Sequence, residues 1–309
     1  MGVSVIIPVF NAEKFIAAAV ESALFHNCVK EIILVEDGSS DNSYQKCKFL
    51  EQKYEKVKLI THNNRENKGA GVSRNLGIYK ATQEYLSFLD ADDYYLENRF
   101  DDLKLLEASD IDGYYGAFGI EFVDEVGKEK WENSFKKNKR ITKINKLVAP
   151  LDLFDYFMGK GKEYNAKGWF HISTLTIKRQ KICDHKIYFP EIRLHQDTIF
   201  ILKCAYLLTI SGAAHNKIIG IRRVHKGNRI TSVKDIKKTQ AVAYKSFFSW
   251  MAKRGYHAKS ELVLLRWKKL EKSKFQLASS IFLILATNFH RVSFTFHTIK
   301  TLFYSYIKR

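Results

Sequence analysis

In the first ninety residues, short apolar runs typical of strands alternate with segments whose apolar residues have helical spacing. This alternation constrains the fold more than any other feature of the chain. Four short apolar runs have the length and composition of buried strands. They are Val3–Pro8, Glu31–Glu36, Val57–Thr61 and Tyr85–Leu89. Between them, apolar residues recur at helical spacing over residues 12–24, 43–54 and 70–81. The alternation of strand and helix predicts a doubly wound α/β domain with a mainly parallel sheet.

Short segments that have neither the strand pattern nor the helix pattern follow three of these apolar runs. They are Pro8–Asn11, Glu36–Ser39 and Asp90–Asp93. Ligands of doubly wound sheets bind beyond the carboxyl ends of the strands, so we expect the functional side chains at this edge. The first run is followed by NAEK rather than by the G-x-G-x-x-G loop that binds dinucleotides. A Rossmann dehydrogenase is therefore disfavoured.

Three carboxylates follow the fourth apolar run within four residues: Asp90, Asp92 and Asp93. Clustered carboxylates repel one another unless a cation lies among them, and oxygen ligands are those that hard divalent cations prefer. We therefore expect one or two of these carboxylates to hold Mg²⁺ or Mn²⁺, which in turn bridges the oxygens of a diphosphate. A solvated acidic cluster is the alternative.

Residues near the other strand ends would suit a nucleotide. The Asp37 carboxylate can accept a hydrogen bond from a base N–H, and the Phe10 ring can cover the face of a nucleobase. Lys68 and Arg74 lie in a glycine-punctuated approach to the third helix, and their charges suit a diphosphate. Simpler alternatives are a capped turn around Asp37 and a structural salt bridge for Arg74.

Basic charge is concentrated at the end of the chain. Residues 226–309 hold 18 lysines and arginines against three acidic residues, and so carry most of the formal net charge of +18. Such a tail suits a polyanionic partner, either nucleic acid or anionic lipid. The uncharged stretch over residues 277–289 is shorter than the ~20 residues that a membrane-spanning helix needs. We expect residues 275–309 to form an amphipathic helix on an anionic membrane surface, with a helix packed on the body as the alternative.

Four segments occur in a characteristic order: VSVIIPVFNAEKFI, EIILVEDGSSDNS, NKGAGVSRNLGI and YLSFLDADDYY. In this order and at these separations they resemble the family 2 glycosyltransferases, which have the GT-A nucleotide-sugar-binding fold. The resemblance covers residues 3–95 and continues more weakly to about Ser232. It implies the transfer of a sugar from a nucleoside diphosphate donor to an acceptor hydroxyl, usually with inversion, in the assembly of surface polysaccharide or lipid-linked glycan.

The resemblance also implies roles for residues on the nucleotide side. Phe10 and Asp37 match the positions that bracket uracil, and Pro8 and Val9 begin the same loop. Arg74 matches the arginine of the family's R-N-x-G segment. These matches imply a UDP-sugar donor.

Further matches concern the metal and the chemistry. Asp90 matches the position near the ribose and diphosphate, and Asp92 matches the metal-ligating carboxylate. Asp197 matches the catalytic base of the family's E-D-x-x-F segment, although Gln196 stands where the glutamate is usual. An inverting transfer needs such a base to take the proton of the acceptor hydroxyl. Asp197 also fits a helix N-cap. His225 matches a histidine that can touch the metal or the diphosphate, with a surface histidine in a flexible loop as the alternative.

The pattern after about Asp110 predicts shorter strands and polar turns, followed by helices over residues 234–255 and 260–274. Trp169 and His171, upstream of the candidate base, are candidates to line the acceptor site, with a core position as the alternative for Trp169. The start of the chain lacks the basic and apolar regions of a signal peptide. We therefore expect a cytoplasmic protein, peripheral on the inner face of the cell membrane.

Together these features predict a metal-dependent inverting glycosyltransferase with a UDP-sugar donor, a lipid-linked or polysaccharide acceptor and no nucleic-acid partner. We expect residues 1–110 to bind the nucleotide sugar, residues 111–232 to form the acceptor-binding and catalytic half of the same GT-A domain, and residues 233–309 to form a basic helical extension. Two alternatives are a catalytically silent module that binds anionic lipid or nucleic acid, and a sugar transferase that acts directly on polyprenyl phosphate.

Overall fold

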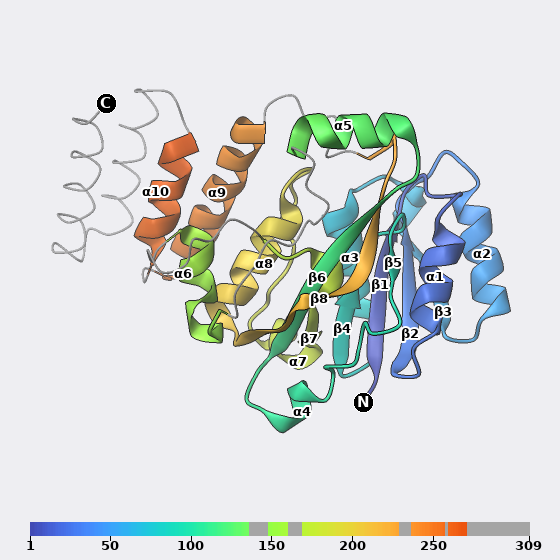
Figure 1. Ribbon diagram of the computed structural model, residues 1–309, viewed down its shortest axis with the longest axis horizontal. Helices are drawn as coiled ribbons and strands as arrows, with labels where there is room; N and C mark the ends of the chain where they lie inside the picture. Colours follow the sequence, from blue (N-terminus) through green and yellow to red (C-terminus); the bar gives the residue numbers. More distant parts are fainter. Residues whose placement is uncertain (136–147, 160–168, 229–235, 257–258, 271–309) are drawn as a thin grey trace. The chain divides into compact units, whose positions relative to one another are not determined.

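A computed structural model describes residues 1–135, 148–159, 169–228, 236–256 and 259–270. The chain divides into two compact units, Met1–Val233 and Lys234–Arg309. The first unit is built around a mixed β-sheet, and the described part of the second consists of two helices (Figure 1).

The strand and helix alternation expected for the start of the chain is confirmed. The strands are β1 (Val3–Val9), β2 (Val29–Glu36), β3 (Val57–Thr61) and β4 (Tyr85–Phe88), and the helices are α1 (Ile16–Leu24), α2 (Ser43–Lys53) and α3 (Ala70–Lys80). β1 pairs in parallel with β2 and β4, and β2 pairs in parallel with β3. The order of the strands therefore reverses between β1 and β4, which is where open α/β sheets bind ligands.

Beyond β4 the sheet continues with β7 (Thr176–Lys178), β6 (Gly113–Phe122), β8 (Ile210–Val224) and β5 (Tyr94–Tyr95). β7 is antiparallel to β4 and β6, β6 is parallel to β8, and β5 is antiparallel to β8. The expectation of shorter strands after Asp110 is wrong for β6 and β8, which have 10 and 15 residues. Both are longer than any of the first four strands.

Glycines explain why these long strands were missed. A Cβ atom at Gly119 of β6 would lie 2.8 Å from Ile221 Cδ1, and one at Gly220 of β8 would lie 2.6 Å from Phe118 Cε2. The bulky neighbours across the β6–β8 pair therefore require glycine at these positions. Glycine interrupts the hydrophobic pattern by which a strand is recognised in a sequence.

Several short helices complete the first unit. They are α4 (Leu105–Ala108), α5 (Glu125–Phe135), α6 (Leu153–Met158), α7 (Arg179–Asp184) and α8 (Gln196–Leu207), with the 3₁₀ segments η1 (Asn63–Arg65), η2 (Pro150–Asp152) and η3 (Ile172–Thr174). α8 packs against α6, and η3 lies against β4, β6 and β8. These contacts bring residues from the second half of the unit to the edge of the sheet.

The second unit contains α9 (Ile236–Lys253) and α10 (Ser260–Leu270), which pack against each other. They confirm the helices expected over residues 234–255 and 260–274 as far as Leu270. Among the helices that are described, none has both the length and the apolar character needed to cross a lipid bilayer. The expected amphipathic segment over residues 275–309 lies outside the described residues.

Helix α3 is held close to the sheet at a glycine. A Cβ atom built on Gly77 would lie only 2.3 Å from Cγ2 of Ile6 in β1, so an alanine there overlaps a fully buried side chain. The close approach sets the distance of α3 from β1. It thereby places Arg74, about one turn earlier on the same helix, relative to the end of the sheet.

We predict that Gly77→Ala destabilises the protein by about 1–3 kcal/mol, because overpacking a filled core outweighs the roughly 1 kcal/mol gain in helix propensity. Urea unfolding measures the change. The Ile6→Ala background removes the obstructing methyl group, so there Gly77→Ala should no longer destabilise, and the two substitutions should show strong coupling in a double-mutant cycle. A Gly77→Ala protein as stable as the wild type contradicts this explanation.

Candidate functional site

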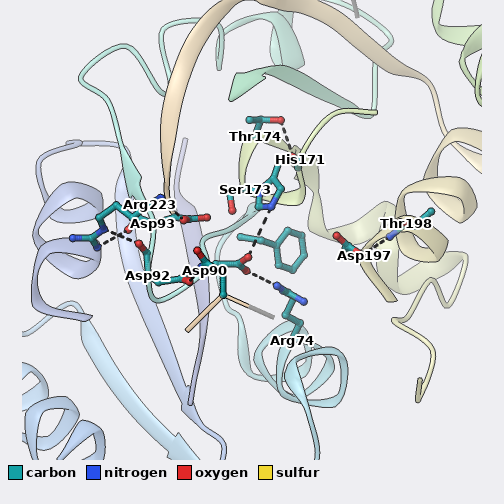
Figure 2. A network of polar contacts seen from close by, with 12 residues as sticks. Arg74, Asp90, Asp92, Asp93, His171, Ser173, Thr174, Asp197, Thr198 and Arg223 are labelled. Carbon is teal, nitrogen blue, oxygen red and sulfur yellow. Dashed lines mark hydrogen bonds and ion pairs between the residues drawn. The ribbon is translucent and has the colours of Figure 1, made fainter. Parts of the chain in front are cut away.

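Acidic residues after β4 meet basic groups from other elements at the end of the sheet (Figure 2). Arg74 of α3 donates a hydrogen bond from Nη2 to Oδ1 of Asp90. Burial works to raise the pKa of Asp90, but the charges of Arg74, His171 and Arg222 oppose it, and the pKa is lowered to about 2. Asp90 is therefore ionised. The structural salt bridge considered for Arg74 is present.

Arg74 keeps hydrogen-bonding capacity despite this pair. The residue is buried, and its Nε and Nη1 atoms have no hydrogen-bond partner in the described part of the chain. Unpaired buried guanidinium groups are costly, and phosphate and carboxylate are the groups whose geometry suits them. Arg74 therefore pairs with Asp90 and keeps two buried donors without a partner among the described residues.

Asp93 has a different protonation state from Asp90. Its side chain is almost fully enclosed, with 1% of the residue exposed. Burial, followed by the charges of Asp92 and Asp90, raises the pKa of Asp93 well above its ordinary value. Its Oδ1 atom accepts the backbone N–H of Arg223 at 3.1 Å. The raised pKa of Asp93 lowers the repulsion within the acidic cluster, because it favours the neutral form of this carboxyl group.

Asp92 and His225, both predicted as metal ligands, come together although they are 133 positions apart. Nε2 of His225 lies 3.2 Å from Oδ2 of Asp92. Asn228 connects them, because its Nδ2 donates to Asp92 Oδ2 at 2.9 Å and its Oδ1 accepts the backbone N–H of His225 at 2.6 Å. Sequence reasoning missed Asn228. The Lys226-Gly227-Asn228 turn, with its glycine, was the available signal.

Asp92 and His225 differ in how well they fit a divalent cation. The Asp92 carboxylate is partly exposed and suits Mn²⁺ or Mg²⁺ directly. Nδ1 of His225 accepts the N–H of Gly227 at 3.2 Å, so the proton of the neutral ring is on Nε2. His225 can ligate through Nε2 only if this proton moves and the contact with Gly227 is given up. As the residues stand, Asp92 is the ligand that fits, and Nε2–H of His225 is a hydrogen-bond donor.

A second group of potential ligands consists of Asp90, Asp93 and His171, whose ligand atoms lie within 4.8 Å of one another. It suits a cation less well. Nδ1 of His171 accepts the N–H of Ser173 at 3.3 Å, which leaves the proton of the ring on Nε2, the nitrogen nearer to Asp90. The structure therefore favours Asp92 as the anchor for a metal.

Arg223 stabilises the acidic loop. Its Nε donates to the carbonyl of Asp92 at 2.6 Å, and its Nη2 donates to the carbonyls of Phe15 and Asp93 at 3.2 and 3.3 Å. The guanidinium also packs over the rings of Phe15 and Tyr94. These contacts join the loop after β4 to the segment before α1.

Arg222, the preceding residue of β8, differs from Arg223 in its contacts. Its side chain makes no hydrogen bond within the described residues, and its guanidinium lies 6.0 Å from the centre of the Trp131 ring. Its charge nevertheless lowers the pKa of Asp90 and opposes the rise at Asp93. Arg222 is therefore a cation near the carboxylates with donors available for a ligand.

Asp37 joins the end of β2 to the loop before α3. Its buried carboxylate accepts the backbone N–H groups of Lys68 at 2.7 Å and Gly69 at 2.9 Å, and its carbonyl accepts Nδ2 of Asn67. Much of its hydrogen-bonding capacity is thus used within the loop. The Lys68 ammonium, considered for a diphosphate, lies 3.6 Å from Glu66.

The end of β1 contributes the other predicted nucleotide residues. Pro8 and Val9 are buried within β1 and pair with β2, so they support the end of the sheet and are not exposed to a ligand. Phe10 is 44% exposed, as a ring that covers a ligand face must be.

Asp197 lies in the first turn of α8 and is not the N-cap. The cap position belongs to His195, which has a left-handed backbone with φ 61°. Oδ1 of Asp197 accepts the N–H of Thr198 at 2.8 Å. Figure 2 shows Asp197 apart from the acidic cluster, and its charge reaches His171, whose pKa it acts to raise. Asp197 thus shares the site without contacting the other carboxylates.

Three further residues singled out in the sequence belong to this half. Gln196, which replaces the usual glutamate, is buried against α3, where a Cβ atom at Gly71 would lie 2.8 Å from its Oε1. Trp169 is half-buried and stacks on Phe157, with ring centroids 4.4 Å apart. It therefore packs against the core on one side, in partial agreement with the core position considered for it. His171 lies at the site, with Nε2 3.9 Å from Oδ2 of Asp90.

The chain is similar in sequence to known glycosyltransferases. Residues 4–162, just over half of the chain, match glycosyl transferase family 2. The uncharacterized glycosyltransferase YibD of Escherichia coli is 37% identical over 200 residues, which are 64% of this chain and 54% of YibD. The GalNAc(5)-diNAcBac-PP-undecaprenol beta-1,3-glucosyltransferase of Campylobacter jejuni is 27% identical over 266 residues, 81% of this chain and 83% of that protein. The chain therefore spans only about half the length of the first of these relatives.

Among solved structures, residues 1–349 of S. aureus TarS in complex with UDP-GlcNAc have a similar fold, with a TM-score of 0.64 and 20% identity. The match covers 87% of this chain and 72% of that one. This likeness confirms the expected GT-A-like α/β fold with a mainly parallel sheet.

Removal of the Arg223 guanidinium should destabilise the fold more than removal of the one beside it. Arg223→Met keeps the alkyl stem but loses the hydrogen bonds to three buried-loop carbonyls, so we expect a loss of about 1–3 kcal/mol in urea unfolding. Arg222→Met removes the same charge without removing a hydrogen bond, and should cost less than half as much. Equal losses for the two variants would show that charge, and not the carbonyl contacts, stabilises the loop.

Proposed function

Because the chain belongs to glycosyl transferase family 2, we propose that it transfers a sugar from a UDP-sugar to a hydroxyl of a lipid-linked or polysaccharide acceptor, with inversion and with Mn²⁺ or Mg²⁺. The names of similar proteins support this chemistry. TarS was solved with UDP-GlcNAc, and the Campylobacter jejuni relative is named as a glucosyltransferase that acts on an undecaprenol-linked glycan. Synthesis of a cell-surface glycan is the corresponding biological role.

One observation carries the proposal: carboxylate and cationic groups meet at the strand-order reversal. Asp92 lies beside His225 at 3.2 Å, and Arg74 and Arg222 have donors available near Asp90. A diphosphate with a divalent cation has the charges that this arrangement complements. A silent binding scaffold gives no reason for these groups to converge.

A divalent cation, when bound at Asp92, supplies charge that stabilises the departing diphosphate. Arg74, Arg222 and Nε2–H of His225 add hydrogen bonds to the same group, so negative charge that develops on it meets donors already in place. Phe10 covers the base, and Asp37 orients the loop before α3 around it. With these roles, residues 1–110 supply most contacts to the nucleotide sugar, and Arg222 of β8 and His225 after it add contacts to the diphosphate.

Asp197 is proposed as the base that takes the proton of the acceptor hydroxyl. It lies apart from the acidic cluster, with His171 under the influence of both Asp90 and Asp197. A base for inversion must approach the sugar from the face opposite the leaving diphosphate, which requires such a separation. Residues 111–232 would then form the acceptor side of the site.

The basic end of the chain is proposed to hold the enzyme at an anionic membrane, on the cytoplasmic face. Residues 226–309 have 18 basic residues against three acidic ones, and each lysine or arginine near an anionic surface contributes about 1 kcal/mol. A lipid-linked acceptor would be presented at that surface.

Calorimetric titration with UDP, GDP, CDP and dTDP, each with and without Mn²⁺, tests the donor class. We expect tight binding of UDP only in the presence of Mn²⁺. Preference for another nucleotide contradicts the assignment of the base site, and the absence of any nucleotide binding contradicts the proposed function.

Asp92→Ala should abolish the Mn²⁺-dependent part of UDP binding with little loss of stability, because the side chain is partly exposed and serves the site rather than the core. Calorimetry measures binding, and EDTA should reduce the wild type to the level of the variant. Asp102→Ala is the matched control, since Asp102 pairs with Lys217 at the surface. Mn²⁺-dependent UDP affinity that survives in Asp92→Ala removes Asp92 as the metal anchor.

Asp197→Asn should keep UDP affinity within about twofold and lower turnover roughly 10²–10⁴-fold, since the amide cannot accept the acceptor's proton. Release of UDP from the UDP-sugar that the wild type uses provides the rate. A variant with near-normal turnover excludes Asp197 as the base.

A further inference from the structure

His171 is held rigidly beside the acidic cluster. Its ring is 8% exposed and stacks on Phe118 of β6, with centroids 4.5 Å apart and planes 5° apart. Its backbone carbonyl accepts the Thr174 hydroxyl at 2.8 Å, which closes the turn into η3. A side chain fixed on its flat face and at its backbone has little freedom to turn. The directions of its two ring nitrogens are therefore set by the fold.

The two ring nitrogens have different environments. Nδ1 accepts the backbone N–H of Ser173 at 3.3 Å, as an N-cap of η3. Burial lowers the pKa of His171 to about 4, so the ring is neutral at physiological pH. A neutral ring with an accepting Nδ1 carries its proton on Nε2. Nε2 lies 3.9 Å from Oδ2 of Asp90, which is too far for a hydrogen bond.

His171 lies under the influence of two carboxylates with different assigned roles. The charges of both Asp90 and Asp197 act to raise its pKa, and Figure 2 shows His171 near Asp90, with Asp197 on the other side on α8. In the proposed function Asp90 belongs to the donor nucleotide and Asp197 to the acceptor. The group that lies between nucleotide and acceptor during transfer is the sugar itself.

We propose that His171 donates a hydrogen bond from Nε2 to a hydroxyl of the transferred sugar and so selects the donor sugar. The inference rests on the proposed function and deepens it by assigning a sugar contact. A hydroxyl beside Nε2 can accept this bond and donate its own proton to Oδ2 of Asp90, which spans the 3.9 Å gap. A sugar without a hydroxyl at this place leaves Nε2–H unpaired, which disfavours its binding.

Two substitutions separate this contact from a structural role. The amide nitrogen of His171→Gln can take the place of Nε2, whereas the amide oxygen of His171→Asn can take the place of Nδ1 and keep the cap on Ser173. We expect His171→Asn to bind UDP-glucose, UDP-galactose or UDP-N-acetylglucosamine about tenfold more weakly than the wild type. Both variants should bind UDP itself within twofold of the wild type, and His171→Gln should recover most of the UDP-sugar affinity.

Each outcome of the titrations, made with Mn²⁺, has a distinct meaning. A wild type that binds no UDP overturns the proposed function and this inference with it. UDP binding together with unchanged UDP-sugar affinity in His171→Asn overturns the inference alone. A milder effect in His171→Asn than in His171→Gln also overturns it, because a purely structural cap predicts that order.

A measurement on the wild-type protein does not depend on whether the two His171 variants fold. With ¹⁵N-labelled histidine, the His171 Nε2–H signal should shift on addition of the UDP-sugar and remain in place on addition of UDP. His26→Phe provides a control, since His26 is buried against Tyr95 and Phe100 and should leave the shift unchanged. Equal responses of the His171 signal to UDP and to the UDP-sugar overturn the proposal.

Discussion

The repulsion among three carboxylates at the end of β4 is the constraint on which the site depends. Three carboxylates within four residues cannot all stay charged and unpaired in a partly buried place. The protein relieves the repulsion differently at each one: Asp90 pairs with Arg74, burial raises the pKa of Asp93, and Asp92 accepts a hydrogen bond from Asn228. Because the partners come from α3 and from the segment after β8, the acidic loop has its observed form only when the sheet is assembled. Stability and chemistry at this edge are therefore coupled.

The division of work between neighbouring arginines follows from strand geometry. Successive side chains of a strand point to opposite faces. Arg223 accordingly binds three carbonyls of the loops around β4 and α1, whereas the Arg222 guanidinium lies near the Trp131 ring and acts on Asp90 through its charge. One residue holds the loop and the other can meet a ligand. A similar division separates Asp37, whose carboxylate is engaged by the loop before α3, from the exposed Phe10.

Local pattern was sufficient for the first ninety residues because each buried strand and each amphipathic helix there carries its own period. It failed for β6 and β8, where Gly119 and Gly220 interrupt the pattern to make room for side chains of the partner strand. It also suggested an N-cap role for Asp197, although a left-handed residue, His195, takes that position. The turn that holds Asn228 was visible in the sequence, but its hydrogen bonds to Asp92 and His225 appear only in the folded chain. These misses share a cause, which is that the deciding neighbour is distant in sequence.

The sequence by itself determined the α/β alternation, the strand ends at which functional residues gather, and the family to which the chain belongs. These properties depend on residues within a few positions of one another. The tertiary structure alone decided how the pKa values of the neighbouring carboxylates differ and which arginine binds the loop carbonyls. Protonation and hydrogen bonding depend on burial and on partners brought close by folding, such as Asp92 and His225 across 133 positions. No local pattern can encode a contact over that separation.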